Sequence, residues 1–355
     1  MSNTNQAAWL LYGATGYTGR LIAEEAARRG LRPVLAGRDE AKVAALGEQL
    51  DLPTRVFALD DAAAVDAGLA GMRAVLHCAG PFSRTARPMI EGCLRTGCQY
   101  LDITGEIDVI EYAAGQMDRA KQAGITVMPA VGFDVVPSDC LARSLSEALE
   151  GATHLALAFT VLEGVSPGTA KTMLESFPQG GKARVDGKIV TVPPAWHERD
   201  VSMAGRTYRA VSIPWGDVAS AYYTTRIPNI ETFIALPRKM AGVMRGGRWM
   251  APLVRVGVVR RSIEWLIDRL VAGPNATQRE RSRSHFWGEV RDPAGHTVTG
   301  TLETPGGYAL TVLTALAVVE RVVRGEVPAG FTTPAGALGK DFILQIPGTA
   351  MRIGT

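Results

Sequence analysis

The chain has 355 residues, about 2.4 times the ~150 residues of a typical domain, so we expect two domains rather than one small module. Hydrophobic residues make up 46% and charged residues 21% of the chain, which excludes an intrinsically disordered protein and a coiled coil. The net charge of +3 is too balanced for a dedicated nucleic-acid-binding protein. We therefore expect a folded protein with no nucleic-acid partner.

Residues 9–12 read as a short apolar strand that leads into a glycine-rich stretch, and residues 20–29 have helical periodicity. A second buried strand is predicted over residues 33–37, so the order is strand, glycine loop, helix and strand, which is typical of dinucleotide binding. Glycines allow a tight turn and a close approach of the backbone to a pyrophosphate, and the start of the helix offers N–H groups to the anion. The predicted cradle consists of Gly13, Ala14, Thr15, Gly16, Tyr17, Thr18 and Gly19.

The second strand ends in Gly37 and Arg38, at the place where an NAD-specific site carries an acidic residue. A guanidinium group pairs with a 2′-phosphate, so Arg38 favours NADP(H) as the cofactor. The alternative is a solvated arginine that precedes a helix beginning near Asp39.

Strands and helices continue to alternate up to residue 130, which predicts a doubly wound parallel sheet of the Rossmann type. Further helices are expected over residues 41–50, 62–68, 87–96 and 110–123, and further strands over 54–59, 74–78, 99–103 and 126–130. Ligands of such sheets bind beyond the carboxyl ends of the strands. This topology brings Asp60 and the stretch Cys78, Ala79, Gly80, Pro81 to the cofactor crevice.

The pattern changes between residues 152 and 301, where strands are predicted over 155–162, 206–213, 222–226, 284–291 and 296–303, together with a hairpin over 185–192 that turns at Gly187. We expect a second α+β domain with a mostly antiparallel sheet. The apolar stretch Tyr308 to Val319 spans only 12 residues, too short for the ~20 that cross a bilayer, and is predicted to be a buried helix.

Four segments together resemble the saccharopine dehydrogenase-like oxidoreductases, particularly their trans-acting enoyl reductase branch. They are Gly13–Gly19, Cys78–Phe82, Tyr100–Glu106 and Gly132–Asp139, and Thr333-Pro334-Ala335 with Gly339 is similar to the closing element of that branch. The resemblance implies that Cys78 to Pro81, Gly132 and Phe133 line the nicotinamide half of the cofactor site. It also implies a discontinuous architecture: a dinucleotide-binding domain over 1–140, a substrate or dimerisation domain over 141–304, and a segment over 305–355 that returns to the first domain.

Hydride transfer needs one group that supplies or stabilises a proton. The candidates are Tyr100, Asp102 and Asp134, and Glu106 is a further acid after the fifth strand. Asp102 and Glu106 would alternatively cap the following turn and helix, and Asp134 would be a turn residue. Cys78 lacks an activating base, since His77 points to the opposite face of the strand.

The four cysteines and five histidines show no zinc or disulfide spacing, so no metal is predicted. The start of the chain has no signal-peptide pattern, so a cytoplasmic location is expected. Residues 238–283 hold 11 basic and three acidic side chains interleaved with apolar ones, which favours amphipathic helices with a basic face. These helices would either present a solvated face or dock an acidic partner: an acyl carrier protein, a coenzyme A phosphate, or an anionic membrane surface to which the protein binds peripherally.

The leading hypothesis is an NADPH-dependent reductase of a conjugated C=C bond in a small-molecule or carrier-bound acyl or polyketide-like substrate. Reduction of an imine, as in saccharopine formation, is the alternative enzyme reading. A non-catalytic NADP-binding sensor or membrane-associated protein is the alternative from another class. A homodimer through the second domain is a further expectation from the resemblance.

Overall fold

The computed structural model describes residues 8–160, 180–236, 262, 263, 265, 269 and 282–354. Contacts divide the chain into a first unit, Met1–Phe133 with Thr311–Ala337, and a second unit, Asp134–Leu310 with Leu338–Thr355. The boundaries predicted from the sequence are residues 140 and 304, and residues 338–355, which the sequence assigned to the first domain, group with the second unit. The roles assigned to the domains remain predictions.

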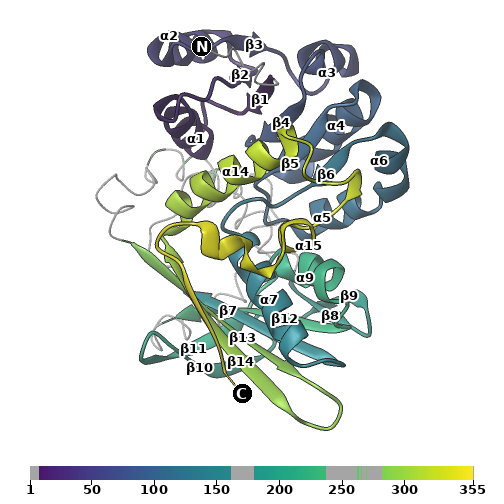
Figure 1. Ribbon diagram of the computed structural model, residues 1–355, viewed down its shortest axis with the longest axis vertical. Coiled ribbons are helices and arrows are strands. Elements are labelled where there is room, and N and C mark those ends of the chain that lie inside the picture. The colour runs from purple at the N-terminus through teal and green to yellow at the C-terminus, as the bar shows by residue number, and fades with distance from the viewer. Residues whose placement is uncertain are drawn as a thin grey trace. The chain divides into compact units, whose positions relative to one another are not determined.

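The first unit contains a seven-stranded sheet in the order β15-β6-β5-β4-β1-β2-β3, with every neighbouring pair parallel (Figure 1). Its strands are β1 (Trp9–Tyr12), β2 (Val34–Gly37), β3 (Thr54–Val56), β4 (Ala74–His77), β5 (Gln99–Asp102), β6 (Thr126–Met128) and β15 (Gly330–Phe331). The predicted doubly wound parallel sheet is confirmed. The strand order reverses between β1 and β4, and β15 comes from a segment some 200 residues beyond β6.

Helices connect these strands. They are α1 (Tyr17–Arg28), α2 (Glu40–Leu50), α3 (Ala62–Leu69), α4 (Phe82–Thr96), α5 (Ile107–Ala114), α6 (Met117–Ala123), α14 (Gly307–Val323) and α15 (Pro334–Leu338). The helix predicted over 110–123 is two helices, because the chain turns at Gly115 and Gln116. The helix predicted from residue 87 begins at Phe82, since a distant side chain caps its start, as described below.

The second unit contains a mixed, mostly antiparallel sheet, which confirms the predicted α+β class. Its strands in the described residues are β7 (His154–Thr160), β8 (Gly181–Val185), β9 (Lys188–Val192), β10 (Glu198–Met203), β11 (Arg206–Ser212), β12 (Asn229–Leu236), β13 (Arg283–Arg291), β14 (Thr297–Pro305) and β16 (Ala350–Gly354). Only β12 and β7 pair in parallel among them. A short 3₁₀ helix, η3 (Lys340–Gln345), precedes β16.

The strand predicted over residues 222–226 is wrong, because residues 222–225 belong to helix α9 (Asp217–Thr225) and Arg226 is its C-cap. The aromatic and threonine residues of this stretch favour a strand locally. In the fold, Val218, Ala219 and Ala221 are buried on one helix that packs against α7 (Val136–Ala148) and β12, and this packing overrides the local preference.

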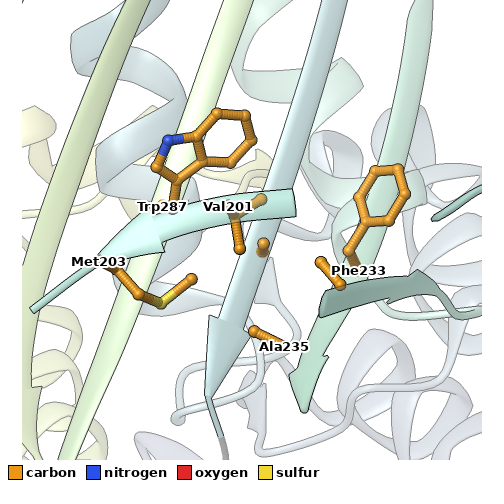
Figure 2. Packing of buried hydrophobic residues seen from close by; sticks show 7 residues of the cluster. Val201, Met203, Phe233, Ala235 and Trp287 are labelled. Atoms are coloured by element: carbon orange, nitrogen blue, oxygen red, sulfur yellow. The ribbon is translucent and has the colours of Figure 1, made fainter. Parts of the chain in front are cut away.

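The sheet of the second unit is packed on both faces. On one face Gly288 and Gly300 admit α7 closely, since a Cβ atom at Gly288 would lie 2.6 Å from Leu145 Cδ1. On the other face β10 lies across the sheet, and its residues Val201 and Met203 lie near Trp287 of β13 (Figure 2). The buried cluster there consists of Ala158, Val201, Met203, Ala210, Phe233, Ala235 and Trp287.

None of the helices in the described part of the chain is long and apolar enough to span a membrane.

Candidate functional site: the carboxyl edge of the first sheet

The glycine loop joins β1 to α1 in a tight turn. Gly13 has a φ of +80°, and a Cβ atom there would lie 2.7 Å from the amide nitrogen of Ala79. A Cβ atom at Gly19 would overlap the carbonyl oxygen of Gly13. The amide nitrogens of Gly13 and Ala14 both donate to Ala36 O, over 2.8 and 3.1 Å. Glycine is therefore required at positions 13 and 19, the first for its backbone conformation and both for lack of space.

The start of α1 differs from the starts of α2, α3 and α4 at this edge. Carboxylates cap the starts of α2, α3 and α4: Asp39 accepts from Lys42 N over 3.1 Å, Asp61 from Ala63 N over 2.9 Å, and Glu106 from two amides of α4. At α1 the N-cap is Gly16, no side chain caps the helix, and its first turn has no acidic residue. The positive end of this helix dipole is thus left to an external anion.

The second strand presents the residues that would distinguish the cofactors. Gly37 is buried, whereas Arg38 and Asp60 are exposed. Arg38 makes no hydrogen bond or ion pair with any other residue that the structure describes, so its guanidinium group is available to a ligand. The Tyr12 hydroxyl, at the end of β1, donates to Phe57 O over 3.0 Å, and burial raises the pKa of that hydroxyl to about 12.

The end of β4 lies beside the glycine loop. Cys78 donates its amide to Tyr12 O over 2.8 Å, and the peptide between Gly80 and Pro81 is cis. Burial, with a smaller effect of the Asp102 carboxylate, raises the pKa of the Cys78 thiol, which therefore stays protonated and is a poor nucleophile.

His77 is fully buried, and burial lowers its pKa to about 3. The Thr85 hydroxyl donates to Ala79 O over 2.6 Å, so the His77 Nε2 atom, 3.0 Å from Thr85 Oγ1, carries the proton of the neutral ring. His77 thus acts as a neutral hydrogen-bond donor to Thr85, which in turn donates to the loop after β4.

Tyr100 and Asp102 lie at the end of β5 and both are fully buried. Tyr100 donates to Asp102 Oδ2 over 2.6 Å, and Asp102 Oδ1 accepts from Thr104 N and Ala130 N over 2.9 and 2.8 Å. Burial raises the pKa of Asp102 to about 6, although these hydrogen bonds to its charged form oppose the shift. Burial also raises the pKa of Tyr100, followed by the effect of Asp102.

Gly132 and Phe133 are tied to α14. A Cβ atom at Gly132 would lie 3.0 Å from Thr311 Cγ2, and Phe133 N donates to Thr311 Oγ1 over 3.0 Å. Asp134 begins the second unit and is half-buried, and its carbonyl oxygen accepts from Trp215 Nε1 over 2.8 Å. The structure thus brings the predicted residues of the first unit to one edge of one sheet, with Asp134 in the other unit.

Sequence reasoning missed two contributors to this edge. Glu106 caps α4, which precedes it in the chain, rather than the helix that follows it. Thr311 lies 178 residues from its partner Phe133. The sequence Thr104-Gly105-Glu106 shows that an acid lies near the turn after β5. No neighbouring residue indicates which helix Glu106 caps. In the described residues, no group of three or more His, Cys, Asp or Glu side chains is placed to hold a metal ion.

The chain is similar in sequence and in fold to known oxidoreductases. Residues 9–128 match the saccharopine dehydrogenase NADP binding domain. A trans-acting enoyl reductase of Mycobacterium leprae is 26% identical, over 98% of this chain and 97% of that protein. The solved structure of apo saccharopine dehydrogenase (L-Glu forming) from Saccharomyces cerevisiae has the same fold, with a TM-score of 0.66 and 14% identity over 98% of this chain and 100% of that one.

The chain is thus similar to saccharopine dehydrogenase-like proteins, by a family model over residues 9–128 and in fold over 98% of its length. A proposed trans-acting enoyl reductase of Mycobacterium tuberculosis is 34% identical over 47% of this chain, but that alignment spans only 43% of the relative's length. The residues that match this NADP binding domain, 9–128, all lie in the first unit. The uncapped start of α1 and the glycine cradle fit the pyrophosphate of a nicotinamide dinucleotide.

Proposed function

We propose that the protein is an NADPH-dependent oxidoreductase that reduces a conjugated C=C bond of an acyl or polyketide-like substrate. The observation that carries the cofactor half of this proposal is the start of α1, the helix that lacks a carboxylate cap where α2, α3 and α4 each have one. Gly13 and Gly19 have no room for a Cβ atom, so the backbone of the loop turns tightly onto the start of α1, as a phosphate site requires.

The residues of the chain have distinct parts in holding the cofactor. Gly13 to Gly19 would hold the pyrophosphate, and Arg38 would pair with a 2′-phosphate, which supports NADPH over NADH. Cys78 to Pro81, Gly132 and Phe133 would border the nicotinamide half, because they follow β4 and β6 on the far side of the strand-order reversal. When bound, the nicotinamide supplies the hydride.

The substrate half of the proposal draws on the names of the relatives, which are trans-acting enoyl reductases. Reduction of a C=C bond also requires a proton at the carbon next to the carbonyl group. Of the three acids proposed for this step, Tyr100 and Asp102 are fully buried and bonded to each other, and Asp134 is half-buried.

The test is NADPH oxidation by the purified protein with 2-enoyl thioesters and enones, with mixtures of 2-oxo acids and amines alongside, and with NADH as the comparison cofactor. We expect turnover of an unsaturated substrate and a preference for NADPH. Turnover of the amine mixtures alone would replace the proposal by imine reduction. Binding of NADPH without turnover of any substrate would favour the sensor.

We also propose that the basic segment 238–283 docks an acidic carrier of the substrate. Most of this segment lies outside the described residues; Ser262, Ile263, Trp265, Arg269, Ser282 and Arg283 are described. Replacement of Arg255, Arg260 and Arg261 by alanine should raise KM for a carrier-bound substrate and reduce its salt dependence. An unchanged KM would refute this role.

A further inference from the structure

A continuous set of hydrogen bonds joins the loops that follow β4, β5 and β6. The Glu106 carboxylate accepts from Phe82 N over 2.8 Å and from Ser83 N over 2.6 Å, after β4. Glu106 N donates to Thr104 Oγ1 over 3.0 Å, and Thr104 N donates to Asp102 over 2.9 Å. Asp102 in turn accepts from Ala130 N over 2.8 Å, after β6, and its carbonyl oxygen accepts from Val131 N over 2.8 Å.

These bonds engage both oxygens of each carboxylate. On Glu106 each oxygen accepts from one amide of the first turn of α4. On Asp102 one oxygen accepts two amides and the other accepts the Tyr100 hydroxyl. Asp102 is also fully buried. Two acids held in this way are suited to fixing backbone, because backbone N–H groups are rigid donors and a carboxylate is a strong acceptor.

The loops that they fix belong to one half of the dinucleotide site. In a doubly wound sheet the strands on either side of the order reversal hold the two mononucleotide halves. Here β1, β2 and β3 lie on the side of the glycine loop and Arg38, and β4, β5 and β6 lie on the other. The hydrogen bonds of Glu106 and Asp102 join only the second group.

We propose that Glu106 and Asp102 are positioning residues for the nicotinamide half of the site: they hold Ala79 to Pro81 and Ala130 to Phe133 in place and do not themselves transfer protons. This inference rests on the proposed binding of NADPH. It assigns to Asp102 a part different from the proton transfer expected from the sequence, and to Glu106 a part that the sequence did not indicate.

A cap that only stabilises α4 would have a different signature. Its loss would lower the stability of the unit and leave the affinities for the whole cofactor and for its adenosine half in their original ratio. Loss of a positioning residue changes that ratio, because only the nicotinamide half depends on the loops after β4, β5 and β6.

The experiment compares dissociation constants for NADPH and for 2′-phospho-ADP-ribose, which lacks the nicotinamide. In Glu106→Ala we expect the constant for NADPH to rise about tenfold, as for the loss of a hydrogen bond to a charged group, and that for the fragment to stay within about twofold. Glu106→Gln should be intermediate, since the amide oxygen still accepts one N–H while its NH₂ group opposes the other.

Glu91→Gln is the matched control. Glu91 lies on α4 itself and likewise connects this helix to the segment after β5, by accepting from the Tyr112 hydroxyl over 2.6 Å and from Arg119. It lies in the middle of the helix, away from the carboxyl edge, so both constants should stay unchanged.

The outcomes separate the two proposals. If the wild-type protein binds neither ligand, the proposed cofactor is wrong. If it binds both and Glu106→Ala weakens both equally or neither, the positioning role is overturned. If Glu106→Ala does not fold, Glu106→Gln decides in the same way, with its fold verified by circular dichroism: an unchanged ratio of the two constants overturns the inference.

Discussion

The carbonyl oxygen of Gly13 lies against Gly19 so closely that a side chain at residue 19 would overlap it. This contact sets the start of α1 directly on the turn that follows β1. Because the start of α1 is the proposed phosphate site, the packing of two glycines controls the position of that site.

Replacing Gly19 by alanine should therefore push α1 away from the loop. We expect a loss of about 1–3 kcal/mol in the free energy of unfolding, as for other overpacked sites, and at least about tenfold weaker NADPH binding. Denaturant unfolding and a fluorescence titration measure the two effects. Gly115→Ala is the control, because its Cβ would be in ordinary contact, 3.4 Å from Tyr112 O, at a φ of −64°. Equal losses in both variants would contradict the prediction.

Replacing Arg38 by alanine should weaken NADPH binding by about 10- to 100-fold, since a hydrogen bond to a charged group contributes about 1.5–3 kcal/mol. Binding of NADH should change little, because it lacks the 2′-phosphate. The control is Arg32→Ala: Arg32 is also exposed but lies before the amino end of β2, where it pairs with Asp51. If Arg38→Ala lowers both affinities by the same factor, Arg38 does not select the cofactor.

Asp102 should make stability depend on pH. Its pKa is raised from 3.8 to about 6 in the folded protein, so the folded state holds the proton more tightly than the unfolded state. The resulting stabilisation is complete below about pH 4 and is lost as the pH rises through 6, by about 3 kcal/mol in total. In Asp102→Asn, which keeps a neutral side chain of the same shape, this loss should disappear. Urea unfolding of both proteins between pH 4 and 7 gives the difference, and parallel curves would refute it.

In the second unit Phe233 is almost fully buried in the cluster that also contains Val201 and Trp287 (Figure 2), and Ala158 lies opposite it on β7. Phe233→Ala should cost about 3–5 kcal/mol in the unfolding of this unit. Leu344→Ala, at a residue that is 44% exposed in the same unit, should change stability by less than about 0.5 kcal/mol. Denaturant unfolding followed by tryptophan fluorescence measures both, and a small effect of Phe233→Ala would mean that the cluster relaxes around the cavity.

Several features of this protein follow from short stretches of sequence. The glycine loop, the two strands that flank it and the helix between them lie within about 30 residues, and their turn chemistry and side-chain periodicity are local properties of the chain. The same holds for the hairpin of β8 and β9 at Gly187. These elements are predictable because the residues that form them are also their main partners.

The tertiary structure decided the rest. Residues 222–225 are helical because α7 and β12 bury one side of α9, and α4 begins at Phe82 because Glu106, 24 residues away, caps it. Phe133 is held by Thr311, and β15 joins the sheet beside β6, through contacts that span 178 residues or more. A sequence pattern shows that a residue is an acid, a hydroxyl or an apolar group. Which distant backbone group it meets is set by packing, because a hydrogen bond across such a separation forms only where the surrounding core has already brought the two segments together.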